Sequence, residues 1–255
     1  KRIEVELLKG TQPEANFRRS SYWNRVPISL RQASLAEGST GLIAEFKRKS
    51  PSKGWFTDSQ LSIESVVVPY AEQGAAAISV LTDTPFFGGS LHDLRQARSA
   101  VTVPLLRKDF VIDSYQISEA KANGADVILL IAACLTPKEV QQLAVFTKEL
   151  GMEVLLELHE EAELGHCCKE IDLVGINNRD LKTFIVDIDR SLRMAEQIPA
   201  DKIKIAESGI GSAEVVQRFR QAGFRGFLIG ETFMKTADPG QAFQQFVQAM
   251  SSKEF

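Results

Sequence analysis

The stretch GLIAEFKRKSPSKG, residues 41–54, decides the fold prediction for this chain. A short apolar run leads into Glu45, Phe46 and Lys47, and a basic turn rich in Ser, Pro and Gly follows. Because the side chains of a strand alternate between its two faces, Glu45 and Lys47 point to the same side. If the other face is packed, two opposite charges lie inward at the carboxyl end of a buried strand. They then either form a structural ion pair or act on a ligand.

The rest of the chain repeats this arrangement as an alternation of buried strands and amphipathic helices. Apolar runs predict strands near residues 42–46, 76–81, 104–108, 126–131, 153–157, 172–176, 203–206 and 226–229. Helical apolar spacing predicts helices near residues 61–73, 90–100, 113–122, 136–150, 160–168, 188–198, 212–222 and 239–250. Typical start and stop residues bound several of these helices: Thr136-Pro137, Ser212, Gly74, Gly124, Gly151 and Gly223.

Eight strand–helix units joined by short loops predict an α/β protein of the closed (β/α)8, or TIM, barrel class. The chain has 255 residues, which suits one such barrel of typically about 250 residues. An open doubly wound sheet is the alternative, but it does not require eight evenly spaced units, and no Gly-rich dinucleotide fingerprint follows the first strand. We therefore expect a single domain over residues 1–255, with a short N-terminal helical extension (residues 1–40) and a barrel (residues 41–250).

The extension itself is predicted to contain two helices. Residues 1–10 form an amphipathic pattern with Ile3, Leu7 and Leu8 on one face, and residues 30–36 suggest a second, short helix. The start of the sequence has no apolar signal-peptide core, and no apolar run approaches the roughly 18 residues of a membrane span.

The composition is that of an ordinary soluble protein, and the cysteine content favours the cytoplasm. The chain is 44% hydrophobic and 25% charged with a formal net charge of −3, which argues against general binding to nucleic acid or to a membrane surface. Three cysteines, Cys134, Cys167 and Cys168, provide no disulfide framework and suit a reducing compartment. A zinc site from His159, His166, Cys167 and Cys168 is not expected, because the last three are consecutive on a predicted helix and cannot converge on one ion.

In a barrel of this class, chemistry gathers at the carboxyl ends of the strands. Charged side chains end several of the predicted strands: Glu45, Lys47, Lys108, Glu157 and Glu207. Any one of them alone is more often structural. Together, opposite charges crowded in one pocket are how proton donors and acceptors are tuned, so we predict acid–base chemistry.

Other residues at the strand ends indicate the shape of a ligand. The backbone N–H groups of Gly209 and Gly230 lie where barrels often hold a phosphate, and Ser50 and Ser208 add hydroxyl donors. Apolar side chains just beyond the strand ends suggest a flat or aromatic part of the ligand: Phe87, Phe110 and Leu181. The alternative is that the glycines only turn the chain and the apolar side chains pack under loops.

Seven motifs, in order and spacing, resemble those of the indole-3-glycerol phosphate synthase family, and together they span the predicted barrel. They are IAEFKRKSPSKG (43–54), LLRKDFVIDSYQI (105–117), GADVILLIAACL (124–135), LLELH (155–159), GINNRDLKTF (175–184), IAESGI (205–210) and FLIGETFMK (227–235). The resemblance implies a step of tryptophan biosynthesis. In it, 1-(2-carboxyphenylamino)-1-deoxyribulose 5-phosphate closes to indole-3-glycerol phosphate with loss of carbon dioxide and water.

The resemblance also implies roles for individual residues. Lys108 is expected to be the general acid in ring closure and Glu157 a proton acceptor. Lys47 would hold the substrate carboxylate and serve as a second acid, with Glu45 orienting it. Which pair carries out each proton transfer stays open. Further residues match catalytic or substrate-binding positions of the family: Asn177, Glu207, Ser208 and Arg179 for substrate groups, Ser50, Gly209, Gly230 and Glu231 for the phosphate, and Phe110 and Leu181 for the ring.

The implied reaction needs no metal or organic cofactor, and the implied partner is a phosphorylated small molecule. At Glu231 we expect the backbone N–H to face the phosphate while the side chain turns away. A monomer or a weak homodimer is expected. Two alternatives stay open: a Schiff-base aldolase with Lys47 or Lys108 as nucleophile, and a phosphate-binding barrel without catalytic activity.

Overall fold

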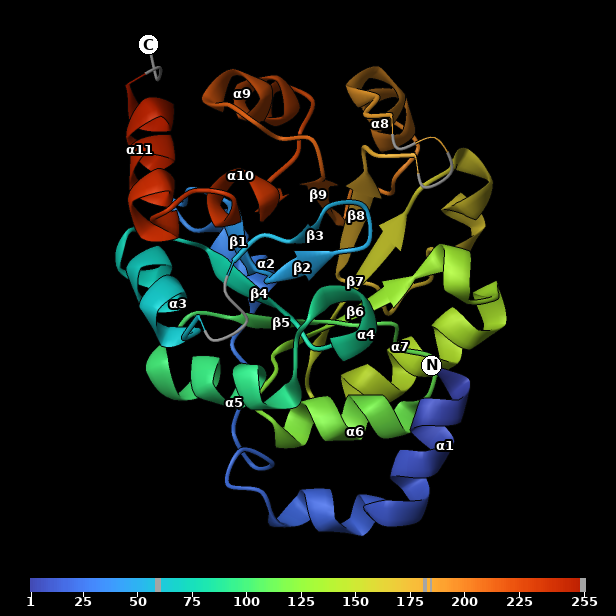
Figure 1. Ribbon diagram of the computed structural model, residues 1–255. Helices are drawn as coiled ribbons and strands as arrows, with labels where there is room; N and C mark the ends of the chain where they lie inside the picture. The colour runs from blue at the N-terminus through green and yellow to red at the C-terminus, as the bar shows by residue number, and fades with distance from the viewer. Residues whose placement is uncertain (58–60, 181–182, 184, 253–255) are drawn as a thin grey trace.

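Eight parallel strands close into a barrel in the computed structural model of the chain, which describes residues 1–57, 61–180, 183 and 185–252 (Figure 1). Each strand lies beside the one that precedes it in the barrel, and the last pairs with the first through Ala44 and Ile229. The predicted barrel and its strands are thereby confirmed. The barrel strands are β1 (Leu42–Phe46), β4 (Ala77–Leu81), β5 (Leu105–Lys108), β6 (Val127–Ile131), β7 (Glu153–Leu158), β8 (Leu173–Asn177), β9 (Ile203–Glu207) and β10 (Gly226–Ile229).

Helices follow the strands and cover the outside of the barrel (Figure 1). The long ones are α3 (Glu64–Glu72), α5 (Leu91–Ala100), α6 (Ser114–Ala122), α7 (Pro137–Glu149), α8 (Ile188–Ala195), α9 (Ala213–Gln221) and α11 (Pro239–Ser251). Shorter elements the sequence did not predict also lie at the strand ends: the hairpin of β2 (Lys49–Ser50) and β3 (Gly54–Trp55), the helices α4 (Thr84–Phe87) and α10 (Glu231–Met234), and the 3-10 turn η2 (Ala132–Cys134). The predicted start of α7 is confirmed, because Thr136 and Glu139 form a reciprocal capping box.

The α-helix expected over residues 160–168 is wrong, since the segment forms the shorter 3-10 helix η3 (Glu161–His166). At each end of η3 a backbone hydrogen bond joins residues three apart in the sequence. The N–H of Glu163 donates to the carbonyl of Glu160, and the N–H of Cys167 donates to the carbonyl of Leu164. Such tight turns are not continued over long runs because their hydrogen-bond geometry is poorer.

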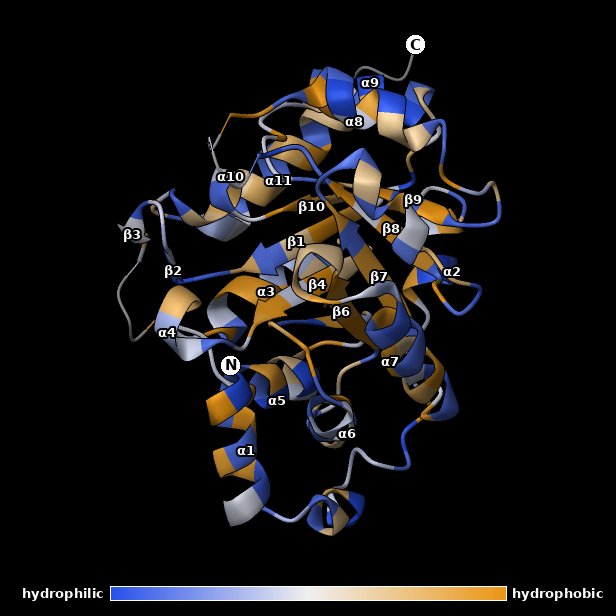
Figure 2. Cartoon of the chain, turned by 90° about the vertical axis from the view of Figure 1, so that its right-hand side faces the viewer, coloured by the Kyte–Doolittle hydropathy of each residue, from blue (hydrophilic) through white to orange (hydrophobic). Residues whose placement is uncertain are grey.

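The strands have one apolar layer on their outer side and another on their inner side. Figure 2 shows the hydrophobic strands enclosed by helices of mixed hydropathy. Outward side chains pack against the helices. Inward side chains fill the barrel as a separate cluster that includes Ile43, Leu106, Leu129, Leu155, Leu173, Ile205 and Leu228. The barrel is therefore a packed core.

The N-terminal extension closes the amino end of the barrel. Helix α2 (Leu30–Leu35) places the fully buried Leu30 in the inner apolar cluster. At the same end, the Ser29 hydroxyl and the backbone N–H of Arg31 donate to the carboxylate of Glu153, the first residue of β7. With this end covered, the carboxyl ends of the strands form the open face.

The remainder of the extension packs against α6. Helix α1 (Arg2–Thr11) and the 3-10 helix η1 (Glu14–Arg19) contribute Val5 and Phe17 to a small apolar cluster with Tyr115 of α6. The buried face predicted for α1 is wrong for two of its three residues: Ile3 is 79% exposed and Leu7 is 66% exposed. The helix instead docks through Val5, with Leu8 packed against the same cluster, because these positions are three apart and face α6.

Within the described ranges, with their gaps at residues 58–60, 181–182, 184 and 253–255, no helix has the length and apolar character required to cross a membrane.

Candidate functional site

The carboxylate of Glu45 is buried at the centre of the open end of the barrel and contacts two lysines. Its Oε1 lies 2.8 Å from Lys47 Nζ and its Oε2 lies 3.2 Å from Lys108 Nζ. Glu45 lies two residues after Ile43 on β1, so the two side chains point to the same inner face of the barrel. Ile43 belongs to the inner apolar cluster, and the layer of charged side chains therefore begins directly above that cluster. Glu45 thus forms one ion pair with a residue close in sequence, Lys47, and a second with a residue far away in sequence, Lys108.

Lys108 joins two strands on opposite sides of the barrel. It ends β5, and its Nζ lies 3.3 Å from Oε2 of Glu207, which ends β9. Gly175 of β8 makes room for Glu207, because a Cβ at this position would overlap Glu207 Oε1. Gly230 has the same relationship to Glu45, since a Cβ there would lie 2.6 Å from Glu45 Oε1. Two glycines therefore admit the two carboxylates that hold Lys108.

Glu157 is the third buried carboxylate, and it has its own donors. Asn177 of β8 donates from Nδ2 to Glu157 Oε1 at 2.8 Å. His159 places Nε2 3.0 Å from the same oxygen. The carboxamide of Asn177 also accepts the backbone N–H of Arg179 at 3.0 Å, which fixes its orientation. The structure thus brings together at one rim the six charged or amide side chains that the sequence predicted: Glu45, Lys47, Lys108, Glu157, Asn177 and Glu207.

The short distances between these charged groups shift their pKa values in opposite directions. Burial alone would raise the pKa of Glu45, but Lys108 and Lys47 lower it to about 2. Burial would lower the pKa of Lys108, but Glu45 and Glu207 raise it well above its ordinary value. Lys108 is therefore a protonated ammonium next to an ionised carboxylate.

Glu157 and Glu207 are pushed in opposite directions. Burial and the negative charge of Glu157 raise the pKa of Glu207 to about 8. Burial opposes ionisation of Glu157 as well, but the contact with His159 and the charge of Lys108 lower its pKa to about 2. Near neutral pH the site then holds one carboxyl group that carries a proton and one that accepts a proton. That is the pattern expected of acid–base catalysis.

The end of β5 is held in place from its outer face. Arg107 contacts Asp109 at 3.1 Å and Glu119 of α6 at 2.9 Å. Lys1, at the start of α1, lies 2.8 Å from Asp109. Because Asp109 follows Lys108 directly, this buried network fixes the strand end from which Lys108 reaches into the barrel.

The turn after β9 carries the only non-glycine residue with positive φ among those the structure describes, Ser208 at φ 66°. Gly209 follows at φ 68°. The carboxamide of Asn178 stabilises this turn, because its Nδ2 donates to the carbonyl of Ser208 at 2.7 Å. A strained backbone held by a buried side chain is typical of functional sites.

The carboxylate of Glu231 contacts two cations, and the expected orientation of this residue toward a phosphate stays a prediction. Glu231 begins α10, and its carboxylate contacts Lys53 Nζ and lies 3.4 Å from Arg179. Burial would raise the pKa of Glu231, but its hydrogen bond and charge pairing with Lys53 lower it. The reason is electrostatic: the two cations, from the segment after β1 and the loop after β8, attract the carboxylate. Ser50, in β2, is also buried, and its hydroxyl lies 3.5 Å from that of Ser52.

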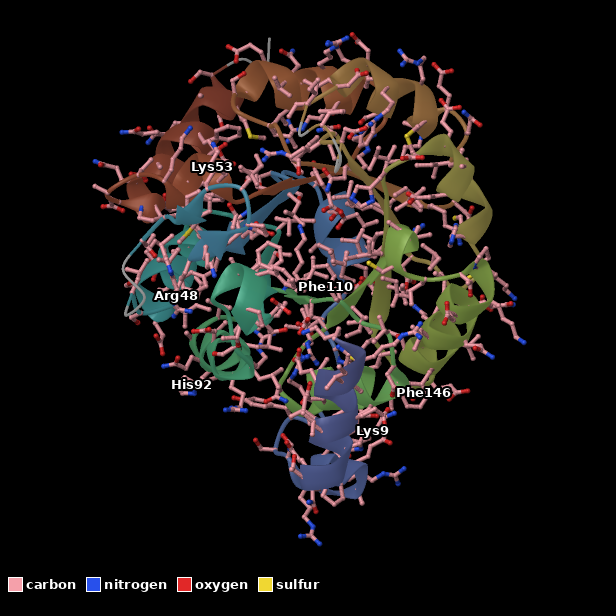
Figure 3. The ribbon with its side chains drawn as sticks, turned by 45° about the vertical axis from the view of Figure 1, so that its right-hand side comes forward. Lys9, Arg48, Lys53, His92, Phe110 and Phe146 are labelled. Atoms are coloured by element: carbon pink, nitrogen blue, oxygen red, sulfur yellow. The ribbon has the colours of Figure 1, made fainter. Side chains whose placement is uncertain are left out.

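Aromatic side chains form one side of the rim. Phe110, after β5, lies with its ring centroid 5.8 Å from Phe86 and 6.2 Å from Phe87, both in α4. Figure 3 shows Phe110 near the start of α1, with Lys53 on the far side of the rim. The predicted residue Leu181 lies outside the described residues.

Sequence reasoning did not single out several residues that shape this rim: His159 as a partner of Glu157, Gly175, Lys53 and Asn178. For His159 the signal was available, because it lies two residues after Glu157 on the same strand face. For Gly175 and Lys53 there was none, because their partners, Glu207 and Glu231, lie far from them in the sequence.

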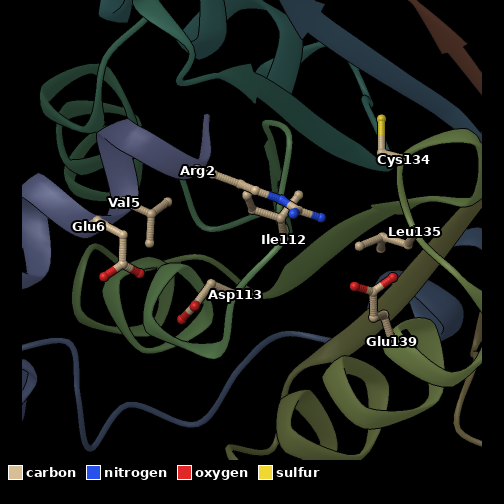
Figure 4. Close-up of a pocket in the computed structure, with 8 residues that line it drawn as sticks. All are labelled: Arg2, Val5, Glu6, Ile112, Asp113, Cys134, Leu135 and Glu139. Atoms are coloured by element: carbon tan, nitrogen blue, oxygen red, sulfur yellow. The ribbon is translucent and has the colours of Figure 1, made fainter.

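A separate hollow of about 370 Å³ lies outside the rim, between α1, the loop after β5 and the start of α7 (Figure 4). Arg2 extends between Ile112 and Leu135, and Cys134 closes one side. None of the residues that line it belongs to the charged group around Lys108. Among the residues the structure describes, no cluster of His, Cys, Asp or Glu has the arrangement of a metal site.

Comparisons with known proteins agree on one family. The model of the family described as "Indole-3-glycerol phosphate synthase" matches residues 1–246. The indole-3-glycerol phosphate synthase of Bacteroides thetaiotaomicron is 51% identical over 251 residues, which cover 98% of this chain and 95% of the relative. That of a Polaromonas species is 46% identical over 219 residues, covering 86% of this chain and 83% of the relative.

Solved structures of lower identity share the fold. The 3-hexulose-6-phosphate synthase of Salmonella typhimurium superposes with a TM-score of 0.63 at 14% identity, over 83% of this chain and 98% of that one. A tryptophan synthase α-subunit of Pyrococcus furiosus superposes with a TM-score of 0.62 at 15% identity, over 83% of this chain and 97% of that one. At such identities the likeness concerns the barrel alone.

Proposed function

Because the chain belongs to the indole-3-glycerol phosphate synthase family, we propose that the charged rim of its barrel carries out the ring closure of 1-(2-carboxyphenylamino)-1-deoxyribulose 5-phosphate. The product is indole-3-glycerol phosphate, and carbon dioxide and water are released. The chain is accordingly a carboxy-lyase of tryptophan biosynthesis. The steps are proton transfers, the formation and cleavage of carbon–carbon bonds, and the cleavage of a carbon–oxygen bond as water leaves, all of which acids and bases accomplish, so the proposal includes no cofactor.

The observation that carries the proposal is the position of Lys108, whose Nζ lies 3.2 Å from Glu45 Oε2 and 3.3 Å from Glu207 Oε2. A protonated amine held at the centre of the rim is a general acid. As the ring carbon attacks the ribulose carbonyl, a carbon–carbon bond forms and the carbonyl oxygen takes a proton from Lys108. Loss of the ring carboxylate as carbon dioxide then restores the aromatic ring. A Schiff-base aldolase would need a neutral amine, which the raised pKa of Lys108 disfavours.

Dehydration requires a second acid and a base. Lys47 holds the substrate carboxylate and then donates a proton to the departing hydroxyl, with Glu45 as the partner that orients it at 2.8 Å. Glu157 accepts the proton lost as the indole double bond forms, and Asn177 orients it. Glu207, with its pKa near 8, and Ser208 contact the polar groups of the substrate. This division of roles is supported by the opposite pKa shifts of Glu157 and Glu207.

The two ends of the substrate meet different surfaces. The phosphate is placed against the backbone N–H groups of Gly209 and Gly230, the Ser50 hydroxyl and the cations that pair with Glu231, Arg179 among them. The anthranilate ring is placed against Phe87, Phe110 and Leu181, of which the two phenylalanines lie 6.2 Å apart by ring centroids. Apolar walls with a few convergent polar groups are the usual design of a small-molecule site.

The remaining features of the proposal concern the chain as a whole. We take residues 1–40 and the barrel as one domain, because Arg25 and the backbone N–H of Ile28 both bind the buried carboxylate of Asp126. The partner is a phosphorylated small molecule, with no nucleic acid or membrane partner. The three cysteines form no disulfide, which agrees with a location in the cytoplasm. As to assembly, the proposal is a monomer or a weak homodimer.

The direct test is turnover of the ribulose substrate by the purified chain, followed by the rise of indole fluorescence. Product formation at the rate of an enzyme is expected. Absence of product over a range of pH and substrate concentration would contradict the proposal. Borohydride treatment with a keto-sugar phosphate is the matched control, since it would label the chain only if a lysine formed a Schiff base.

A further inference from the structure

The chain has three histidines, and one of them is buried beside the acid–base group. His159 is 5% exposed, whereas His92 is exposed on α5. His159 follows the end of β7 and, two residues after Glu157, shares its inward face. The third, His166, ends η3, and its two ring nitrogens lie 2.9 Å and 3.0 Å from the backbone carbonyls of Glu163 and Leu135.

His159 lies between two carboxylates. Its Nε2 is 3.0 Å from Glu157 Oε1, and its Nδ1 is 3.9 Å from Glu163 Oε2. The second carboxylate is itself fixed, because Glu163 Oε2 accepts the backbone N–H of His159 at 2.6 Å and that of Glu160 at 3.2 Å. The ring is therefore held from both sides by groups of negative charge.

Charged and titratable groups from the neighbouring elements add to this field. Glu207 of β9 acts on His159, and Lys108 of β5 acts on Glu157. Cys134 of η2 lies close enough for Glu157 and Glu163 to raise the pKa of its thiol, in addition to the effect of burial. Burial would lower the pKa of His159, but the contact with Glu157 and the surrounding carboxylates raise it. An imidazolium in this position is paired with negative charge on both faces.

We propose that His159 is a positioning residue that acts through Glu157: together with Asn177 it fixes Glu157 Oε1 and keeps this carboxylate ionised as the proton acceptor. Asn177 Nδ2 donates to Glu157 Oε1, and His159 Nε2 lies 3.0 Å from the same oxygen, so neither occupies Oε2. The inference rests on the role proposed for Glu157 above. A buried cation costs free energy through desolvation unless it is paired, and here the pair it forms is with a group of the reaction centre.

The test is a double-mutant cycle on kcat. His159→Leu, which removes both the charge and the donor, should lower kcat roughly 10-fold or more, a part of the 10² to 10⁴-fold that a positioned acid–base group contributes. In a Glu157→Gln background the same substitution should cost less than about 3-fold, because the residue through which it acts is already disabled. His159→Gln, which keeps a neutral donor near Nε2, should recover part of the loss, and His92→Gln is the control that leaves kcat unchanged.

A merely structural role gives a different result. His159→Leu would then lower the melting temperature and reduce kcat by the same factor in both backgrounds, which would overturn the proposal. An unchanged kcat in the His159→Leu variant would overturn it as well.

A second measurement does not depend on turnover, so it separates this inference from the proposed reaction. In NMR titrations of the imidazole signals, with His159 assigned by its loss in His159→Gln, the ring should lose its proton at higher pH than an ordinary imidazole. Its midpoint should fall in Glu157→Gln and, by a smaller amount, in Glu163→Gln, since the second carboxylate is farther from the ring. A midpoint at the ordinary imidazole value, or one unmoved by Glu157→Gln, would overturn the inference even if the wild-type chain forms indole-3-glycerol phosphate.

Discussion

Lys108 Nζ lies 3.2 Å from Glu45 Oε2, although β4 stands between the strands that carry them. The two residues are joined by neither sequence proximity nor a shared pair of strands. Both point into the barrel at its carboxyl end, where side chains of alternate strands meet in one layer. This contact, with Glu207 on the opposite side, makes Lys108 the centre of the charged group.

Replacing Lys108 tests its role as the acid. Lys108→Ala should lower kcat by about 10² to 10⁴-fold, the usual contribution of a positioned proton donor. Lys108→Arg is the informative companion, because guanidinium keeps the charge beside Glu45 and Glu207 but does not give up its proton. Steady-state kinetics should find both variants impaired. Normal turnover by Lys108→Arg would show that charge alone is required.

The raised pKa of Glu207 predicts how stability depends on pH. Folding raises this pKa from 4.5 to about 8, so between these values the folded chain holds a proton that the unfolded chain has released. The contribution of Glu207 to stability therefore falls as pH rises from 4.5 to 8. In Glu207→Gln this fall is absent, so the variant should gain stability relative to wild type on going from pH 5 to pH 8. Urea denaturation at the two pH values measures it, and an equal difference at both would contradict the prediction.

Gly175 is predicted to be indispensable for the geometry of the site. A Cβ at this position overlaps Glu207 Oε1, so Gly175→Ala should displace the carboxylate from Lys108 and destabilise the chain by about 1–3 kcal/mol, as overpacked cores do. Gly211→Ala is the matched control, because its Cβ would have no neighbour within 4 Å. The melting temperature and kcat should both fall in Gly175→Ala and stay near the wild-type values in Gly211→Ala.

Asp126 is predicted to hold the extension on the barrel. Its fully buried carboxylate accepts from Arg25, Arg98, and the backbone N–H groups of Ile28 and Leu105. Asp126→Ala leaves these donors unpaired and should cost about 3–5 kcal/mol in the free energy of unfolding.

The control for Asp126 is Asp201→Ala, which removes a carboxylate that pairs with the adjacent Lys202 and whose side chain is 70% exposed. A pair on the surface is worth about 0–1 kcal/mol. Chemical denaturation of the two variants gives the comparison. Similar stabilities would show that the buried contacts of Asp126 contribute little.

Glu231 is predicted to limit the affinity for phosphate. Its carboxylate forms ion pairs with Lys53 and Arg179. In Glu231→Gln both cations should be free to bind the substrate phosphate, so KM should fall while kcat changes little. Lys53→Gln should have the opposite effect and raise KM. An increase of KM in Glu231→Gln would show instead that the carboxylate is needed to hold the two cations in place.

Much of the fold was predictable because buried parallel strands are apolar along their whole length. That property marked all eight strands of the barrel. The alternation of side chains within a strand also predicted that Glu45 and Lys47 lie on one face, and the structure places them 2.8 Å apart. The docking face of α1 and the segment Glu161–His166 were harder, because a short amphipathic pattern does not say which face docks or whether a turn continues as an α-helix.

By itself, the sequence determined the number and position of the barrel strands, the charged residues at their ends and the family motifs. Each of these is a property of residues close together in the chain. Only the tertiary structure decided that Lys108 reaches Glu207 across the barrel, that Gly175 makes space for this carboxylate, and that Glu231 contacts Lys53 and Arg179. The physical reason is closure of the sheet: it brings strand ends that are far apart in sequence to within hydrogen-bonding distance, and no local pattern encodes which of them meet.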